Sequence, residues 1–514
     1  MKNAAITTEN VAELKRRISE LEALVKYYEE QFRLTKHRQF GVSSEKSEYD
    51  FGQISIFNEA EFTSDANATE PELIEIETHY RKRKRLINDI LPEDLPIEIV
   101  EHALPAVEQT CAECGEDLHI MGRDTRRELV IIPAQVKIRE HIQYVYSCRN
   151  CEKHGDHVPV VKAPMPEPVI KGSFASPEAV AYTMIQKFVM SVPLYRQEQE
   201  WDRQGIFLSR QTMSNWLMRC AEDWLEPIYE RLKARLLEHD ILNADETTLQ
   251  VLREPDKTAQ SKSYMWLYRT SRDAEHPIVL YEYQPSRKAS HPAVFLKDFK
   301  GYLHADGYDG YHKLPDYITV VGCFSHVRRK FDEALKSLPE KGRAGSNALL
   351  GKRYCDKLFE LERDFAKLSP DERFLKRQEL SKPLLEEFFT WCNALDAAPK
   401  SPIARAAFYA LSQRKYLERY LLDGRLEISN NRAERSIKPF VIGRKNWLFA
   451  NTPRGAKASA IIYSVIETAK EHNLNPFDYL VYIFQNARNW DIWNNSDALD
   501  QLMPWAMPGI VKTS

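Results

Sequence analysis

The apolar positions at the start of the chain follow a seven-residue pattern. They are spaced alternately by three and four residues, at Val11, Leu14, Ile18, Leu21, Val25, Tyr28 and Phe32. Charged neighbours such as Lys15 and Glu22 keep the rest of this segment polar. An apolar seam of this kind predicts a self-associating coiled coil over residues 1–44, and therefore a dimer or higher homo-oligomer. A helix that packs on its own domain is the less favoured alternative.

Residues 45–100 lack a comparable apolar pattern. An acidic stretch over 45–77 is followed by the basic run 81–85. Low hydrophobicity and blocks of like charge are typical of a solvated linker. Contact of the basic run with DNA phosphates is the second and less favoured reading.

Two Cys-x-x-Cys pairs lie in the next segment, 101–165. Cys111 and Cys114 form the first pair, Cys148 and Cys151 the second, and strand-like text over 128–132, 136–142 and 144–148 lies between or beside them. Two such knuckles can place four thiolates tetrahedrally around zinc. We expect a zinc-ribbon-like domain whose Zn²⁺ is structural, because four protein ligands leave no open position for catalysis.

Helical patterns dominate 170–236. Ser176 and Pro177 are typical of a helix start, a second helix is expected over 194–204, and a third begins at Arg210 after a glycine-containing turn. This order indicates a helix-turn-helix-like DNA-binding region with Arg210, Gln211 and Asn215 facing outward. Many helical hairpins share the pattern, so a purely structural hairpin stays open.

Strand-like segments follow over 240–251, 264–268, 277–283, 301–306 and 318–323, and the last of these leads into a helix over 326–335. Three strands in sequence and then alternation of strand and helix is the order of a ribonuclease-H-like core. In such a core the fourth strand lies beside the first. Asp245 would then lie within the first strand and Asp306 at the end of the fourth. Two neighbouring carboxylates repel each other unless a cation lies between them, which predicts Mg²⁺ or Mn²⁺. Turn or capping roles are the alternative for both acids.

An almost wholly helical segment over 343–422 interrupts this core and is expected to be scaffold. The core resumes with a helix that Ser429 could cap, on which Asn430, Glu434 and Lys438 share one face at four-residue steps. A third acid on a helix face is what a pair of metal ions would need, although an exposed helix glutamate is the plain alternative.

The composition of the chain restricts the possible classes of protein but does not identify one. The chain has 514 residues, 43% of them hydrophobic and 29% charged, with a net charge of −3. That length favours several domains. No apolar run approaches the roughly 20 residues of a membrane-spanning helix, and the polar start is unlike a signal peptide, so we expect a cytoplasmic protein. Four further cysteines, Cys220, Cys323, Cys355 and Cys392, are expected to serve packing.

Several motifs together resemble the transposases of the IS66 insertion-sequence family. They are the Cys-x-x-Cys pairs, Asn243-Ala-Asp245-Glu-Thr, His304-Ala-Asp306-Gly-Tyr, Cys323-Phe-Ser-His326-Val-Arg-Arg-Lys-Phe331, and the long motif from Ser429 to Phe449 with Glu434 inside it. The resemblance covers nearly the whole chain in the right order. It implies a DDE catalytic triad that falls on Asp245, Asp306 and Glu434.

The resemblance further implies phosphoryl transfer assisted by two Mg²⁺ or Mn²⁺ ions, with DNA ends and target as partners and accessory proteins of the same element as further candidates. Basic and aromatic residues near Glu434 could then hold DNA by phosphate contacts and stacking, against the alternative of a solvated basic face. These residues are Arg432, Arg435, Lys438, Arg444, Lys445 and Trp447. His326 and Arg329 are candidates for support of the site, with a structural histidine as an equal alternative. A nucleoid-associated location would follow.

The expected architecture is therefore multidomain α+β. Its parts are a coiled coil (1–44), a charged linker (45–100), a zinc-binding domain (101–165), a helix-turn-helix-like region (170–236), the ribonuclease-H-like core in two segments (237–340 and 426–472), the helical insertion (341–425) and a C-terminal tail (473–514). Two other functions stay open: a non-catalytic DNA-binding regulator built on the zinc and helix-turn-helix modules, and a general nuclease without end specificity.

Overall fold

The computed structural model describes residues 136–147 and 160–507 of the chain. These residues belong to two separate units, 136–164 and 165–507. The expected coiled coil, the charged linker and the four paired cysteines Cys111, Cys114, Cys148 and Cys151 lie outside the described residues, so the structure does not test them.

The smaller unit contains a two-stranded antiparallel ribbon. Strand β1 (Val145–Ser147) pairs with β2 (Val160–Lys162), with Val145 opposite Lys162. The strand expected over 136–142 is wrong, because these residues have no regular secondary structure and are exposed. An alternation of apolar and polar residues does not by itself make a strand, because a strand also needs a hydrogen-bonded neighbour. The neighbouring strand β2 is already paired with residues 145–147.

The larger unit begins with the helical region that the sequence predicts. Helices α4 (Pro177–Phe188), α5 (Leu194–Arg203) and α6 (Arg210–Cys220) are followed by a π-helical turn and α7 (Glu226–Leu237). The expected cap at Ser176 is confirmed, since its hydroxyl oxygen accepts a hydrogen bond from the amide of Ala179 at 3.1 Å. Ser209 caps α6 in the same way through the amide of Thr212 at 3.1 Å.

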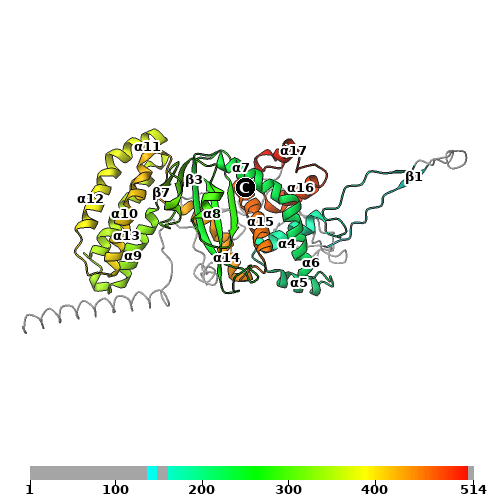
Figure 1. Ribbon diagram of the computed structural model, residues 1–514, viewed down its shortest axis with the longest axis horizontal. Coiled ribbons are helices and arrows are strands. Elements are labelled where there is room, and N and C mark those ends of the chain that lie inside the picture. The colour runs from blue at the N-terminus through cyan, green and yellow to red at the C-terminus, as the bar shows by residue number, and fades with distance from the viewer. Residues whose placement is uncertain (1–135, 148–159, 508–514) are drawn as a thin grey trace, which may run out of the picture. The chain divides into compact units, whose positions relative to one another are not determined.

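A five-stranded sheet forms the centre of this unit (Figure 1). Its strands are β3 (Ile241–Gln250), β4 (Lys262–Thr270), β5 (Val279–Gln284), β6 (Gly301–His304) and β7 (Ile318–Val321). The spatial order is β5-β4-β3-β6-β7. The first three strands are antiparallel, whereas β6 is parallel to β3 and β7 is parallel to β6. The fourth strand therefore lies beside the first, as expected.

Helices cover both faces of this sheet. Residues that pair across antiparallel strands share a face, so Asp245 shares one face with Leu267 and Tyr281. On that face lies α14 (Asn431–Trp447), since the Tyr281 hydroxyl donates to the carbonyl of Ser436. Trp266 is on the other face, where its ring contacts Tyr311 at 5.8 Å between centroids. This face also receives the short helix α8 (Ser290–Phe295), whose Phe295 ring stacks on Tyr268.

Helix α9 (Phe324–Ser337) follows β7 and opens the helical segment, which confirms the all-helical reading of 343–422. Its helices are α10 (Asn347–Asp364), α11 (Pro370–Lys376), α12 (Lys382–Ala394) and α13 (Pro402–Leu417). They gather beyond β7 in Figure 1 and share a hydrophobic core built around Phe331, Leu358 and Phe388. A larger core surrounds the sheet.

The chain then closes on the sheet and the N-terminal helices. Helix α15 (Pro453–Glu471) lies along β5, α16 (Pro476–Ala487) contacts α4, and α17 (Ser496–Asp500) contacts α7. Short helical turns occupy Ala221–Leu225, Tyr311–Lys313, Glu340–Gly342, Phe365–Lys367, Arg377–Ser381, Glu418–Leu422 and Pro504–Ala506. Among the residues described, no helix combines the length and the apolar character needed to cross a bilayer.

Candidate active site

Strands β3 and β6 bring Asp245 and Asp306 to the same edge of the sheet. Asn243 of β3 is in register with His304 of β6, and each acid lies two residues further along its chain. Asp245 is still within β3, whereas Asp306 lies just beyond the end of β6. Because the two strands are parallel, equal offsets from a paired position place both side chains at neighbouring points.

The carboxylate of Asp245 is close to several other acids. Its Oδ1 accepts a hydrogen bond from the amide of Glu246 at 2.8 Å. Burial, followed by the negative charges of Glu246, Asp306 and Glu434, raises the pKa of Asp245 well above its usual range. Such a crowding of carboxyl groups is unfavourable when all are ionised and becomes favourable around a divalent cation. The donor set therefore fits Mg²⁺ or Mn²⁺, which prefer carboxylate oxygens.

Asp306 is held in a tight turn. Its Oδ1 accepts a hydrogen bond from the amide of Tyr308 at 2.9 Å, and its Oδ2 lies 3.9 Å from the Arg287 guanidinium. A Cβ at Gly307 would lie 2.6 Å from the hydroxyl of Tyr409 on α13, so a larger residue here would force the tyrosine ring to shift. Asp306 thus makes the turn contact that was weighed as its alternative role, and it does so beside Asp245.

Glu434 comes from the first turn of α14, and a buried asparagine pair fixes where this helix begins. The Asn430 side-chain amide donates to the Ala244 carbonyl at 2.7 Å, and its side-chain oxygen accepts from Asn243 at 3.0 Å. The expected cap at Ser429 is wrong: Asn430 occupies the N-cap position and uses its side chain on β3 instead of the helix. The helix start is therefore fastened to the strand that carries Asp245.

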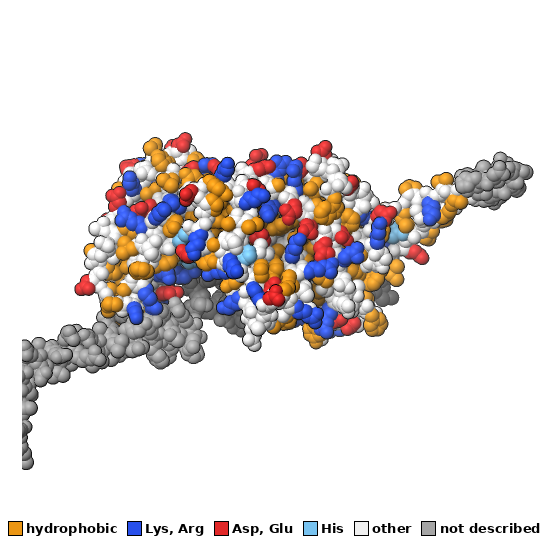
Figure 2. All heavy atoms as spheres, viewed as in Figure 1, with side chains coloured by type: hydrophobic (Ala, Val, Ile, Leu, Met, Phe, Trp, Pro, Cys, Tyr) orange, Lys and Arg blue, Asp and Glu red, His pale blue; other side chains and the backbone are white. Residues whose placement is uncertain are grey.

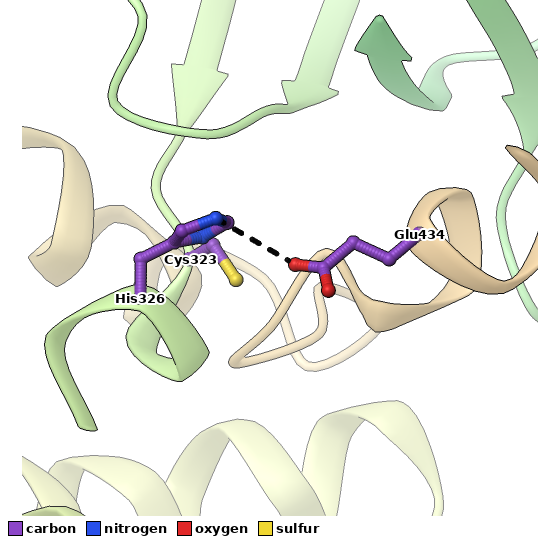
Figure 3. A group of neighbouring side chains, drawn as sticks. All are labelled: Cys323, His326 and Glu434. Carbon is purple, nitrogen blue, oxygen red and sulfur yellow. Dashed lines mark ion pairs between the residues drawn. The ribbon is translucent and has the colours of Figure 1, made fainter. Parts of the chain in front are cut away.

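Two residues of α9 lie against the Glu434 carboxylate, and Figure 3 shows the first of them, His326. The Nε2 atom of His326 is 3.8 Å from Oε1, and the Arg329 guanidinium is 3.5 Å from Oε2. Burial lowers the pKa of His326, and the nearby Glu434 charge opposes this shift. His326 and Arg329 thus both lie beside Glu434, and their support of the site stays a prediction.

Sequence reasoning missed two residues at this site. Glu246 has a side chain only 1% exposed, and its carboxylate accepts hydrogen bonds from Arg287 and from the Tyr311 hydroxyl. Cys323 was assigned to packing and is buried, yet its sulfur lies beside His326 and Glu434. An acid inside an apolar strand was a signal for Glu246, and the motif from Cys323 to Phe331 was a signal for Cys323, since none of the other unpaired cysteines lies in a motif.

Helix α6 presents its polar side chains as the sequence predicts. Arg210, Gln211 and Asn215 are exposed, whereas Met213 and Trp216 are buried against the domain. Arg210 forms an ion pair with Glu198 of α5 at 3.6 Å. The third helix of the region thus exposes these three polar side chains to solvent, and the charge of one of them, Arg210, is partly neutralised by Glu198.

The basic residues of α14 differ in their surroundings. Arg435 and Lys445 are exposed, and Lys438 is half-buried. Arg432 forms an ion pair with Glu427 at 3.5 Å, and Arg444 donates to the hydroxyls of Thr247 and Thr248 on β3. Trp447 packs on Phe440, with 5.4 Å between ring centroids. On the face seen in Figure 2, Lys and Arg side chains are interspersed with acidic ones.

Family comparisons agree with this arrangement of parts. The model described as "Transposase IS66 family" matches residues 172–458, and "zinc-finger binding domain of transposase IS66" matches 108–152. "Transposase C of IS166 homeodomain" matches 27–100, and "IS66 C-terminal element" matches 464–505. The 172–458 match contains Asp245, Asp306 and Glu434, and the 108–152 match contains all four paired cysteines.

Relatives of similar length occur in Sinorhizobium fredii, and their descriptions assign no function. The uncharacterized protein y4hP is 28% identical over 440 residues, which are 82% of this chain and 77% of y4hP. The uncharacterized protein y4qI is 30% identical over 424 residues, which are 79% of this chain and 75% of y4qI. With a family match over more than half of its length, this chain belongs to the IS66 family of transposases.

Proposed function

We propose that this chain is a DDE transposase that binds the ends of an insertion sequence and cuts and joins DNA with divalent metal ions. The observation that carries this proposal is the environment of Asp245, whose pKa is raised by burial and by the charges of Glu246, Asp306 and Glu434. Asp306, in the turn after β6, and Glu434, on α14, thus both act on the carboxyl group of β3, and family membership supplies the DNA-processing context.

We propose further that the central sheet is a ribonuclease-H-like core. Its order, β5-β4-β3-β6-β7 with an antiparallel first half and a parallel second half, supports this assignment. The helical segment after α9 would then be an insertion between the second and third acids. The chain returns from it at Ile428, whose carbonyl accepts a hydrogen bond from the amide of Phe324 at 3.0 Å.

In this mechanism the protein's own residues hold and orient the charged groups. Asp245 and Asp306 would hold metal ions at the strand ends, and Glu434 would complete the set from α14. Bound Mg²⁺ or Mn²⁺ would activate water, and later a DNA 3′-hydroxyl, and stabilise the leaving oxygen of an in-line displacement. Arg287 and Arg329 lie beside Asp306 and Glu434 and would keep these carboxylates in place.

DNA contact is proposed for two surfaces. On α6 the exposed Arg210, Gln211 and Asn215 could reach base edges in a major groove. On α14 the basic residues could bind phosphates next to Glu434. Arg435 and Lys445 suit this role best because they are exposed, whereas Arg432, Arg444 and Trp447 are engaged with Glu427, β3 and Phe440. Lys438, which is half-buried, lies between Arg435 and Arg444 on this helix.

The remaining parts of the proposal rest on sequence and family. Cys111, Cys114, Cys148 and Cys151 would hold a structural Zn²⁺ ion, in keeping with the zinc-finger match over 108–152. The heptad segment would join copies of the chain, and accessory proteins of the same element could take part. A place on the bacterial nucleoid would follow from DNA binding.

The decisive experiment is a strand-transfer assay with labelled duplexes that carry the inverted repeats flanking the coding sequence. Wild type is compared with Asp245→Asn, Asp306→Asn and Glu434→Gln in Mg²⁺ and Mn²⁺. Each variant should lose at least about 100-fold in joining, since each removes a charge that stabilises the transition state. End binding in a gel-shift assay should remain.

Asp309→Asn is the matched control. Asp309 lies three residues after Asp306 but is exposed and paired with Lys313 at 2.8 Å, so joining should be unchanged. If all three triad variants join ends as well as wild type does, the triad is wrong. Binding to ends without any metal-dependent cleavage by wild type would favour the DNA-binding regulator. Cleavage without preference for the ends would favour a general nuclease.

A further inference from the structure

Cys323, His326 and Glu434 form a mixed sulfur, nitrogen and oxygen cluster at the start of α9. One ligand atom from each residue, the cysteine sulfur, a ring nitrogen and a carboxylate oxygen, lies within 4.8 Å of the others. Figure 3 shows the imidazole and the sulfur of α9 turned toward the carboxylate from α14. Cys323 is the N-cap residue of α9 and His326 is in its first turn, so a Cys-x-x-His spacing places both on the same side.

Polar atoms in this cluster lack hydrogen-bond partners although they are buried. Glu434 Oε2 has Arg329 beside it, but Oε1 has no partner, and neither has Nδ1 of His326. The Nε2 to Oε1 separation of 3.8 Å exceeds the range of a hydrogen bond. Buried carboxylate and imidazole atoms are rarely left unpaired without a reason, and a role as metal ligands is one such reason.

We propose that Cys323, His326 and Glu434 bind a divalent transition-metal cation of the zinc class. Thiolate and imidazole suit Zn²⁺, whereas Mg²⁺ prefers oxygen ligands alone. Tetrahedral zinc with ordinary bond lengths places its ligand atoms roughly 3.3–3.7 Å apart. The His326 Nε2 and Glu434 Oε1 atoms, 3.8 Å apart, are already near that spacing, and all three ligand atoms lie within 4.8 Å of one another. On binding, the Cys323 thiol releases its proton to solvent, and the fourth position stays open to water.

The position of the sulfur is set by the same contacts that place α14. Cys323 Sγ accepts a hydrogen bond from the amide of Asn430 at 3.1 Å, and Asn430 is fastened to β3. Cys323 and His326 are therefore held at the start of α9 and Glu434 on α14, and Asn430 links both helix starts to β3, the strand that carries Asp245. This cluster differs from the zinc-finger match, which ends at residue 152.

Because Glu434 belongs to both sets, a cation held by Cys323 and His326 would withdraw this carboxylate from the catalytic ions. Zinc would then inhibit DNA joining in the presence of Mg²⁺. This second half of the inference rests on the proposed function, whereas the binding itself does not.

Binding is tested on the full chain with Zn²⁺ alone, in competition with a chromophoric zinc indicator. Wild type should bind one more equivalent than Cys323→Ser or His326→Gln, or bind that equivalent more than about 10-fold more tightly. Cys220→Ser and His291→Gln are matched controls, because neither residue belongs to the cluster. Cys220 is buried in α6, and the His291 ring is hydrogen-bonded to the Ser286 hydroxyl. Both controls should keep the wild-type stoichiometry.

Equal zinc binding in wild type and in both cluster variants would overturn the proposal. If Cys323→Ser fails to fold, His326→Gln decides alone, because His326 is partly exposed. In the joining assay, the zinc concentration that halves activity should rise for His326→Gln relative to that variant's own activity in Mg²⁺. A failed triad assay would leave the binding result standing, so the two proposals fail separately.

Discussion

Buried carboxyl groups are costly in their ionised form, and this chain offers two different ways to compensate them. Asp245 lies among further acids at a strand edge, where a divalent cation would balance the charges. Glu282 of β5 has Glu230 as its one acidic neighbour among the causes of its pKa shift. Burial raises the pKa of Glu282 to about 7, against the opposing effects of its hydrogen bond with Gln284 and the charge of Lys233. A proton therefore compensates Glu282 over most of the acidic range.

This difference predicts the pH dependence of stability. Between the ordinary glutamate pKa and about 7, Glu282 keeps its proton in the folded chain but loses it in the unfolded chain. The unfolded state then binds fewer protons, so stability falls as pH rises through this window and stays lower above it. Glu282→Gln should raise the free energy of unfolding at pH 8 by roughly 1–3 kcal/mol, and the melting temperature should rise with it. At pH 4.5 the substitution should change both quantities little.

Thermal unfolding of wild type and Glu282→Gln at both pH values checks this prediction. Glu340→Gln serves as the control, since Glu340 is exposed and lies outside this strand. A gain from Glu282→Gln that is equal at pH 4.5 and pH 8 would show that ionisation of Glu282 is not the cause.

Individual residues could be predicted where a residue differs in chemical type from its neighbours in the sequence. Asp245 could be found because an acid stands within an apolar strand, and the register of β3 with β6 agrees with its expected closeness to Asp306. The motif that begins at Cys323 did not show that its sulfur lies near Glu434, because that closeness depends on two helices that are about 110 residues apart in sequence. Long-range packing of that kind leaves no local pattern.

At the scale of elements, the outer edge of the sheet is closed by a helix instead of a further strand. Strand β5 is an edge strand, and α15 lies along it. The hydroxyl of Thr468 accepts from the amide of Val279 at 3.1 Å and donates to its carbonyl at 3.0 Å. Ser464 accepts from the amide of Tyr281 at 2.7 Å. Two helix hydroxyls thus satisfy backbone groups that would otherwise be open to pairing.

Removing one of these hydroxyls should loosen the edge. Thr468→Val keeps the volume of the side chain but leaves a buried amide and carbonyl without partners, which costs about 1–3 kcal/mol. Hydrogen exchange of the peptide that contains Val279 should accelerate, and the melting temperature should fall. Ser459→Ala on the same helix is the control, because its hydroxyl bonds only to the Gly455 carbonyl. Unchanged exchange at Val279 in Thr468→Val would contradict this account.

Element boundaries were predictable where capping chemistry is local. Ser176 and Ser209 begin α4 and α6 as expected, since each hydroxyl bonds an amide three residues ahead. Ser429 failed as a cap because Asn430, one residue later, is drawn into contacts with Asn243 and Ala244 of β3. The strand expected over 136–142 failed because a strand requires a partner, and alternation of side chains does not provide one.

The helical segment affects the site through its helix α13. The amide of Gly322 donates to the Tyr416 carbonyl at 3.0 Å, and Tyr409 approaches Gly307 beside Asp306. Both tyrosines belong to α13. The segment between the second and third acids is therefore packed against the loop of Asp306 and returns directly into the start of α14, so its folding helps to set where Glu434 lies.

At the scale of the whole molecule, family matches cover most of the chain, and the first of them includes all of the segment 45–100 that the sequence predicts to be a charged linker. Matches over 27–100, 108–152, 172–458 and 464–505 follow one another along the chain. The last of these matches falls on α15, α16 and α17, which pack against the sheet and the N-terminal helices of the larger unit. The segment named a tail from sequence is thus part of the folded core.

The heptad pattern before residue 33 makes a prediction about assembly that is independent of the sheet. Leu14 and Leu21 occupy equivalent positions one heptad apart in the apolar seam. Leu14→Glu combined with Leu21→Glu would place charges inside a coiled coil and should dissociate the oligomer. Arg16→Glu combined with Ala23→Glu adds the same acids two residues further on, on the face opposite the seam, and should leave the oligomer intact. Light scattering over a range of protein concentrations measures the mass of each form against the 59.9 kDa of one chain. A mass that is unchanged by the leucine substitutions would mean that the copies associate elsewhere or that the chain is monomeric.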